Sequence, residues 1–236
     1  MNYIRNSMET VSLIIPCIDA HFQYLSNLMD QIISGVVIPH EIVIVVNNHE
    51  LIEHQDIVNI QRTYDSKLKS LKIIGISNRI TPGRARQIGV DNSTGSIIIF
   101  QDADDFIHPQ RIQIIMHMFK KYDIVHLNHG CIKILRARKD CPFYKLDDIK
   151  YHGPDFTYNH MIKHSREPYY LRKIPFKIVC GVPAVRRHVF DEVKWLDQNG
   201  CEDSMFCRKV CETFKKSAII DTPLITYNYY RSSSKL

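Results

Sequence analysis

The chain has 236 residues, of which 44% are hydrophobic and 24% are charged, and its net charge is +6. These are ordinary values for a globular protein, so they exclude a disordered tail protein and a coiled coil. The positive charge suits an anionic ligand such as a nucleotide, but it is too small to indicate nucleic acid by itself. No run approaches the roughly 20 apolar residues of a membrane span, and the first ten residues contain no apolar segment typical of a secretory signal.

Short apolar runs alternate with helical patterns through the first half of the chain. The runs predict strands at 11–15, 41–46, 71–76, 96–100 and 123–127. Between them the pattern predicts a helix that Asp19 caps, helices over about 51–69 and 109–120, and one that Thr81 caps with Pro82 in its first turn. This alternation predicts βαβ units, hence an α/β fold with a mostly parallel sheet. Nearly continuous apolar strands predict helices on both faces.

The pattern weakens between about 130 and 180 and then becomes clear again. We predict helices at 183–192 and from Glu202 to about 214, and a strand near 218–220. No linker or internal repeat interrupts the chain, so we expect one domain over 1–236. The seven cysteines contain no Cys-x-x-Cys pair, and Cys207 and Cys211, with Cys180 and Cys201, match no structural zinc pattern. Free thiols indicate a reducing compartment, so we expect a soluble, cytoplasmic protein.

An acidic loop follows the predicted strand 96–100. Ligands of parallel sheets bind beyond the carboxyl ends of the strands, where this loop lies. In an extended chain Asp102 and Asp104 would project to the same side. Two such carboxylates can hold a divalent cation whose remaining ligands are substrate phosphates. The loop lacks the oxygen and glycine positions of an EF-hand; a solvated, Asp-rich turn is the alternative that short acidic motifs leave open.

Four segments in this order resemble glycosyltransferase family 2, whose members have the GT-A fold. They are Val-Ser-Leu-Ile-Ile-Pro at 11–16, Pro-Gly-Arg-Ala-Arg-Gln-Ile-Gly at 82–89, Gln-Asp-Ala-Asp-Asp at 101–105 and Cys-Glu-Asp at 201–203. The resemblance spans nearly the whole chain. It implies a nucleotide-sugar-binding half over about 1–128 and an acceptor-binding, catalytic half over about 129–236.

The resemblance also implies roles for single residues, listed here by ligand. Pro16, Cys17, Asp19, Asn47 and Asn48 would lie near the nucleobase, Asp102 near the ribose, and Ala103 and Arg84 or Arg86 near the nucleotide-sugar; Asp104, with Asp102, would hold Mn²⁺ or Mg²⁺ on the diphosphate.

Two positions depart from the family pattern. The family usually has an acidic pair after its second strand, where this chain has Asn47 and Asn48. An amide oxygen can still accept a hydrogen bond from uracil, but an amide also donates, so a preference for UDP is expected without being fixed. In its closing segment the family often has a metal-binding His, where this chain has Tyr230, and His108 is one candidate to replace it.

The Cys-Glu-Asp segment at 201–203 contains the candidate general base. An acceptor hydroxyl loses its proton as it attacks the sugar, and a carboxylate within hydrogen-bond reach takes it. We expect Asp203 rather than Glu202 to have this role, although acidic residues at a helix start also act as simple caps.

The resulting hypothesis is a metal-dependent, inverting glycosyltransferase that moves a hexose from a nucleotide-sugar, expected to be UDP-linked, to a glycan or glycoprotein acceptor. We expect no nucleic-acid partner and no transmembrane segment, and the basic stretches leave peripheral membrane association open. The alternatives are a nucleotide-sugar-binding domain without transfer activity and a basic nucleic-acid-binding protein; the latter predicts salt-sensitive binding without metal.

Overall fold

The structure, a computed structural model, describes residues 9–133, 142–158, 177–178 and 182–227. The strands in these ranges are β1 (Val11–Ile18), β2 (Glu41–Asn47), β3 (Leu71–Ile76), β4 (Ile97–Phe100), β5 (Phe106–Ile107), β6 (His126–Lys133), β7 (Tyr151–His152), β8 (Lys177–Ile178), β9 (Ala184–Arg186) and β10 (Ser217–Tyr227). The α-helices are α1 (Leu25–Ile33), α2 (His54–Tyr64), α3 (Pro82–Asp91), α4 (Arg111–Lys121), α5 (Pro154–Tyr158), α6 (Val189–Glu192) and α7 (Glu202–Phe214), and a 3-10 helix, η1 (Asp19–Tyr24), precedes α1.

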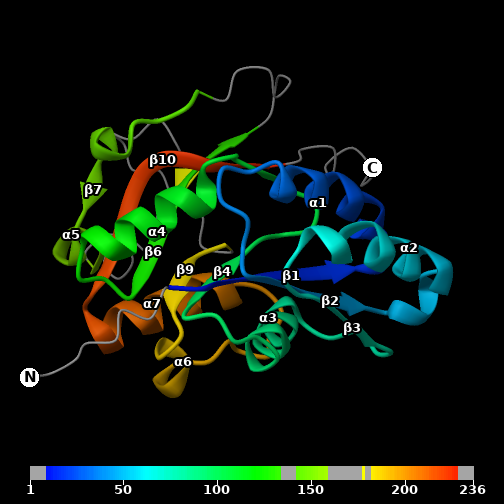
Figure 1. The fold of residues 1–236 in the computed structure, drawn as a ribbon. Coiled ribbons are helices and arrows are strands. Elements are labelled where there is room, and N and C mark those ends of the chain that lie inside the picture. Colours follow the sequence, from blue (N-terminus) through cyan, green and yellow to red (C-terminus); the bar gives the residue numbers. More distant parts are fainter. Residues whose placement is uncertain (1–8, 134–141, 159–176, 179–181, 228–236) are drawn as a thin grey trace, which may run out of the picture.

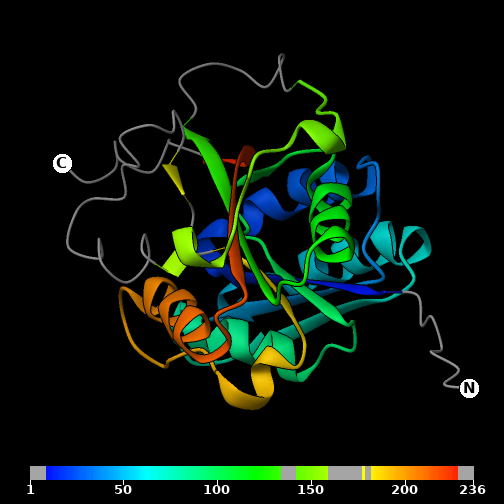
Figure 2. The ribbon, with the colours of Figure 1, turned by 90° about the vertical axis from the view of Figure 1, so that its left-hand side faces the viewer.

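The strands of the described residues form one curved sheet in the order β3-β2-β1-β4-β9-β6-β10-β5, with β7 paired to β10 and β8 to β6 (Figure 1). Strands β1 to β4 are parallel, and so are β6 and β10, which lie beside each other in Figure 2. Strand β9 runs antiparallel between β4 and β6 and so joins the two parallel groups. The predicted α/β fold with a mostly parallel sheet is confirmed.

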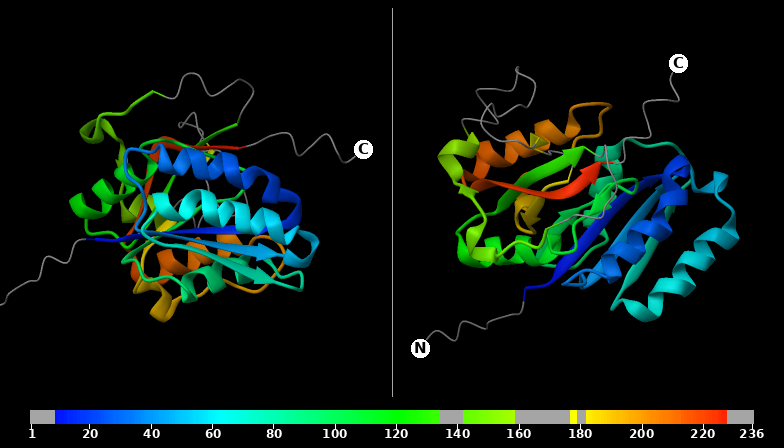
Figure 3. Two further views of the ribbon diagram at one scale, coloured as in Figure 1. Left: turned by 45° about the vertical axis from the view of Figure 1, so that its right-hand side comes forward. Right: turned by 90° about the horizontal axis from the view of Figure 1, so that it is seen from above.

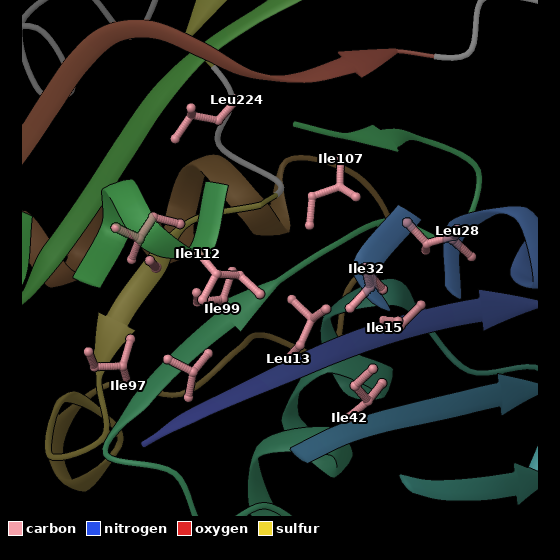
Figure 4. Packing of buried hydrophobic residues seen from close by; sticks show 14 of the residues in the cluster. Leu13, Ile15, Leu28, Ile32, Ile42, Ile97, Ile99, Ile107, Ile112 and Leu224 are labelled. Atoms are coloured by element: carbon pink, nitrogen blue, oxygen red, sulfur yellow. The ribbon is translucent and has the colours of Figure 1, made fainter. Parts of the chain in front are cut away.

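Helices cover both faces of the sheet, as the apolar strands predict. In Figure 1, α1, α2 and α4 lie on one face, and α3, α6 and α7 lie on the other. Figure 3 shows α1 and α2 side by side over β1, β2 and β3. Each face has its own buried cluster, one containing Leu13, Ile15 and Ile42 and the other Ile14 and Val43. Successive strand residues therefore enter opposite cores, and Figure 4 shows the first of these cores.

Most predicted elements are present, and their differences have local causes. The predicted helix at 183–192 is wrong: Ala184–Arg186 is strand β9, and only Val189–Glu192 is helical. Three residues are too few to show the alternating pattern of a strand, so hydrogen bonding to the neighbouring strands determines that this segment is extended. Asp19 does not cap a helix, since η1 has Ile18 at its N-cap and no side-chain cap bond. Thr81 does cap α3, and its hydroxyl accepts from the Arg84 N–H at 3.1 Å.

No helix in the described ranges combines the length and apolarity needed to cross a membrane.

Candidate active site

The carboxyl ends of β1, β2 and β4 and the N-terminal ends of α3 and α7 surround a cavity of about 440 Å³. Residues that the sequence singled out from both halves of the chain line it together: Pro16, Cys17, Asn47, Arg86, Asp102, Asp104, Glu202 and Asp203. The strand ends meet at one edge of the sheet because β1, β2 and β4 are parallel. Helix α7 adds its first two residues, so the acidic pair from the second half faces the acidic loop from the first.

The other predicted nucleotide-binding residues are not part of this lining. The Oδ1 atom of Asp19 accepts a hydrogen bond from Asn48 Nδ2 at 3.5 Å, which joins the loops after β1 and β2. Arg84 is exposed on α3, and Ala103 is buried at 1% exposure. Of the two arginines that the motif at 82–89 offered, Arg86 is therefore the one that the helix turns toward the cavity.

Arg86 joins the two acidic segments. Its Nη2 lies 3.0 Å from Asp102 Oδ1 and its Nη1 lies 3.0 Å from Glu202 Oε1. The guanidinium carbon also lies 4.9 Å from the centre of the Trp195 ring. Burial by itself would lower the pKa of Arg86, but the charges and hydrogen bonds of Asp102 and Glu202 raise it. This charged bridge fixes the start of α7 against the acidic loop.

The acidic loop turns and is not extended. The Asp105 N–H donates to the Asp102 carbonyl at 3.3 Å, and Gln101 Nε2 donates to the same carbonyl at 3.0 Å. The premise of an extended chain is therefore wrong, yet Asp102 and Asp104 both reach the cavity. They do so because the turn is held from inside the protein.

Arg111, at the start of α4, provides that support. It is fully buried and donates to Gln101 Oε1 at 3.0 Å and to the Phe100 and Val182 carbonyls at 2.8 Å. Burial lowers the pKa of Arg111 to about 9, against the opposing charges of Asp102 and Asp105. The positively charged guanidinium of Arg111 therefore lies beneath the carboxylates of the acidic loop, where it offsets part of their mutual repulsion.

Asn47 has both of its amide groups engaged by the protein backbone. Its Nδ2 donates to the Ile80 carbonyl at 2.8 Å, and its Oδ1 accepts from the Ile80 N–H at 3.0 Å. The side chain is only 2% exposed. Asn47 thus fixes the segment before α3 as one wall of the cavity, which is a role that the strand pattern could not reveal.

Residues that the sequence did not single out also line the cavity, among them His21, Arg79, Asn199 and Gly200. Arg79 is exposed and brings a second guanidinium to the cavity edge. His21 Nδ1 lies 3.6 Å from Asp104 Oδ1. His21 follows the end of β1 closely, so its position beyond a parallel strand was the available signal.

His108, in contrast, is turned away from the cavity. Its Nδ1 accepts from the Gln110 N–H at 3.1 Å, and its Nε2 lies 3.2 Å from the Pro142 carbonyl. Burial lowers the pKa of His108, and the Pro142 carbonyl opposes that shift. Gln110 and Pro142 therefore hold His108 outside the cavity lining; Tyr230 lies outside the described residues.

Gly83, in the motif at 82–89, lies where a side chain would not fit. A Cβ atom on Gly83 would lie 2.1 Å from the Leu196 carbonyl oxygen. This approach presses the segment before α7 onto α3, with Trp195 N–H donating to Gln87 Oε1 at 3.1 Å. Asn199 and Gly200 reach the cavity from the same segment.

The described thiols near the site belong to no cluster of side chains that could hold a metal ion. Burial, reinforced by the charges of Asp104 and Asp19, raises the pKa of Cys17 to about 12, so it stays a neutral thiol. Cys207 and Cys211 are buried thiols, with Sγ atoms 3.9 Å from Asn128 Oδ1 and His126 Nδ1, and Cys180 lies outside the described residues. Among the residues that the structure describes, no group of three or more His, Cys, Asp or Glu side chains could hold a metal ion by itself.

The fold is similar to that of solved structures of one protein, TarS. TarS residues 1–349 from S. aureus match with a TM-score of 0.68 and 16% identity over 92% of this chain and 60% of that one. The same TarS segment in complex with UDP matches with a TM-score of 0.67 and 17% identity over 92% of this chain and 60% of that one. Its complex with UDP-GlcNAc matches with a TM-score of 0.67 and 17% identity over 92% of this chain and 58% of that one. This chain thus spans three fifths of those chains or slightly less, and identities this low show the fold alone.

The family follows from the sequence. None of the curated proteins matches the chain. The family model described as glycosyl transferase family 2 matches residues 12–194, which is most of the chain and includes the first strand, the arginine-bearing helix and the acidic loop. The chain belongs to glycosyl transferase family 2.

Proposed function

We propose that this protein transfers a hexose from a UDP-linked sugar to a hydroxyl of a glycan or glycoprotein acceptor, with inversion at the anomeric carbon. The observation that carries the proposal is the single cavity in which Asp102, Asp104 and Arg86 meet Glu202 and Asp203. Family membership supports the reaction class. The TarS complex with UDP-GlcNAc supports the class of donor, since that fold binds it.

Asp203 is the proposed base because Glu202 is already engaged. Glu202 is buried, and its Oε1 accepts from Arg86. Asp203 is half-buried, and the Ser204 N–H and hydroxyl both donate to its Oδ1, at 2.6 and 3.3 Å. Among the described residues none donates to Oδ2, so this oxygen is placed to take the acceptor's proton. Glu202, through Arg86, orients the start of α7.

Departure of UDP leaves negative charge on the diphosphate, which the cavity meets with cationic groups. Arg79 lies at its edge, and Arg86 offsets the charge of Asp102 so that the acidic loop can face an anion. A divalent cation held by Asp104 would supply electrostatic stabilisation of the leaving oxygen. Asp104 fits this role because it is 6% exposed, lines the cavity and has a hard oxygen donor.

The proposed nucleobase pocket includes the cavity wall that Asn47 stabilises. Because both amide groups of Asn47 bind Ile80, we propose that Asn47 shapes the base pocket and that uracil contacts the backbone of the segments after β1 and β3. Asn48, joined to Asp19, holds the neighbouring loop.

The test is donor binding and turnover of Asp203→Asn. Because general-base catalysis contributes roughly 10²–10⁴-fold, we expect the rate of transfer to fall at least about 100-fold. UDP should raise the thermal midpoint of the variant as much as that of wild type, because the substitution leaves the diphosphate side of the cavity intact. Glu202→Gln is the comparison: it should lower stability as well as rate because it removes the carboxylate charge that pairs with Arg86.

Unchanged turnover of Asp203→Asn would contradict the assigned base. Wild-type protein that binds UDP but transfers no sugar to any acceptor would instead support the alternative of a nucleotide-sugar-binding domain. Salt-sensitive binding to nucleic acid without any response to nucleotides would contradict both.

A further inference from the structure

The tryptophan before α7 contacts both halves of the candidate site. Trp195 is 5% exposed and is not part of the lining of the catalytic cavity. The centre of its ring lies 4.9 Å from the guanidinium carbon of Arg86. The ring also stacks on Phe206 of α7, with centres 4.1 Å apart, and meets the edge of Phe100, the last residue of β4, at 4.9 Å. One side chain thus touches the arginine-bearing helix, the strand before the acidic loop and the helix of the acidic pair.

The ring of Trp195 adds a third restraint on Arg86. The Nη1 and Nη2 atoms of Arg86 each donate to one carboxylate, that of Glu202 and that of Asp102, at 3.0 Å. Its buried Nε atom has no hydrogen-bond partner among the described residues. Two bonds fix two points of a planar guanidinium and leave its plane free to turn about the axis through them. An indole against the guanidinium removes that freedom, and a cation over an aromatic ring is also electrostatically favourable.

We propose that Trp195 is a positioning residue: it holds the guanidinium of Arg86 in the plane that bridges the two acidic segments, and so raises the affinity of the cavity for the donor diphosphate. This inference rests on the proposed function. Arg86 lines the cavity, and a guanidinium that turns out of this plane no longer pairs with Asp102. The unpaired carboxylate then repels the diphosphate, because charges in a partly buried site are weakly screened. Trp195, outside the cavity lining, acts through Arg86.

The experiment compares Trp195→Leu with Phe190→Leu in the full chain. Phe190, in α6, is 6% exposed and belongs to the same aromatic cluster, since its ring stacks on that of Phe206 with centres 5.7 Å apart. Of the two rings, Arg86 lies over that of Trp195. Both variants should unfold at a lower urea concentration than wild type, because each leaves a gap in the core. With Mn²⁺ present, only Trp195→Leu should raise the dissociation constant of UDP, measured by titration calorimetry, by at least about tenfold.

Two further variants separate positioning from packing. Trp195→Phe keeps a ring face for Arg86, so it should raise the dissociation constant of UDP by no more than about threefold. In an Arg86→Met background Trp195→Leu should cause no further rise, because the group that it positions is absent. A packing effect would instead act equally in both backgrounds.

The contact can also be tested without a nucleotide. Trp195 is the only tryptophan in the sequence, so the tryptophan fluorescence reports its surroundings alone. Removing the cation over the ring in Arg86→Met should shift the emission maximum, whereas Arg84→Met, which changes an exposed arginine of the same helix, should leave it unchanged. This comparison keeps Trp195 in place, so it stays decisive if Trp195→Leu does not fold.

The outcomes separate this inference from the proposed function. Equal rises of the UDP dissociation constant in Trp195→Leu and Phe190→Leu, or a further rise in the Arg86→Met background, would mean that the ring only packs. The inference would then be wrong, while UDP binding stands. An emission maximum that Arg86→Met leaves unchanged would likewise overturn it. Wild-type protein that binds no UDP would contradict the proposed function and, with it, the effect on donor affinity.

Discussion

Arg86→Met is the sharpest test of how the two halves of the site are held together. The substitution keeps the length of the side chain but removes its charge and both of its hydrogen bonds, to Asp102 and Glu202, each 3.0 Å long. The carboxylate of Glu202 is 11% exposed and that of Asp102 is 31% exposed. Glu202 would therefore become a buried, unpaired charge, whereas water would partly solvate Asp102.

The exposed fractions of the two carboxylates determine how much unfolding free energy the substitution removes. A hydrogen bond to a charged group contributes about 1.5–3 kcal/mol; the buried bond to Glu202 belongs at the upper end and the half-solvated bond to Asp102 at the lower end. We expect a loss of about 3–5 kcal/mol of unfolding free energy, as for other buried pairs that lose one partner. In urea this corresponds to a midpoint lower by about 1–2.5 M, given slopes of about 2–3 kcal/mol per molar.

The assay is urea unfolding monitored by fluorescence and circular dichroism. Arg84→Met is the matched control, since Arg84 is exposed on the same helix and its loss should stay within about 0.5 kcal/mol. In the double variant with Glu202→Gln, removing the unpaired charge should restore at least about 1 kcal/mol. If Arg86→Met and Arg84→Met lose equal stability, or if Glu202→Gln restores nothing, the bridge does not fix α7 and the reasoning fails.

Three further predictions concern the supports of the site and the sheet. Arg111→Met leaves the Phe100 and Val182 carbonyls without their donor, at about 1–3 kcal/mol each; urea unfolding should show a loss above about 2 kcal/mol, and a loss below 1 kcal/mol would contradict this. Burial would raise the pKa of Glu41, but hydrogen bonds from Ser12, Thr94 and Gly95 lower it to about 2, from 4.5. Its stabilisation is therefore complete above about pH 4.5 and is lost toward pH 2, so in a pH series wild-type stability should fall more steeply there than that of Glu41→Gln; parallel curves would refute the assignment. Gly83→Ala places a Cβ 2.1 Å from the Leu196 carbonyl and should raise the dissociation constant of UDP, measured by titration calorimetry, at least about tenfold, whereas Gly153→Ala, with its nearest neighbour at 3.3 Å, should not change it.

Much of the fold could be read from the sequence because local rules act there. Strand β3 coincides with its predicted range 71–76, and β2 exceeds its prediction by one residue, since β-branched runs between turn residues leave few alternatives. The start of α3 was predictable because a Thr cap followed by Pro specifies a helix N-terminus locally. Helix α7 was predicted from Glu202 to about 214 and spans Glu202–Phe214, with Phe206, Cys207, Val210 and Cys211 buried.

The elements that pair with distant strands were not predictable in this way. Strand β9 has three residues and is extended because β4 and β6 pair with it on both sides. Strand β10 continues to Tyr227 because β6, β7 and β5 pair with it in turn. Hydrogen bonds between segments far apart in the chain decide such strands, so local propensity is overruled.

The site shows the same division between features that local sequence determines and features that long-range contacts determine. The sequence by itself determined the family, the acidic loop and the acidic pair at 202–203, because each is a contiguous motif with a chemical meaning. Only the tertiary structure decided that Arg86 bridges Asp102 to Glu202, 116 residues away from it, that Asn47 is engaged by Ile80, and that His21 rather than His108 faces Asp104. These are contacts across loops whose relative positions depend on the packing of the whole sheet. A motif identifies which residues carry chemistry, and the fold decides which partner each of them meets.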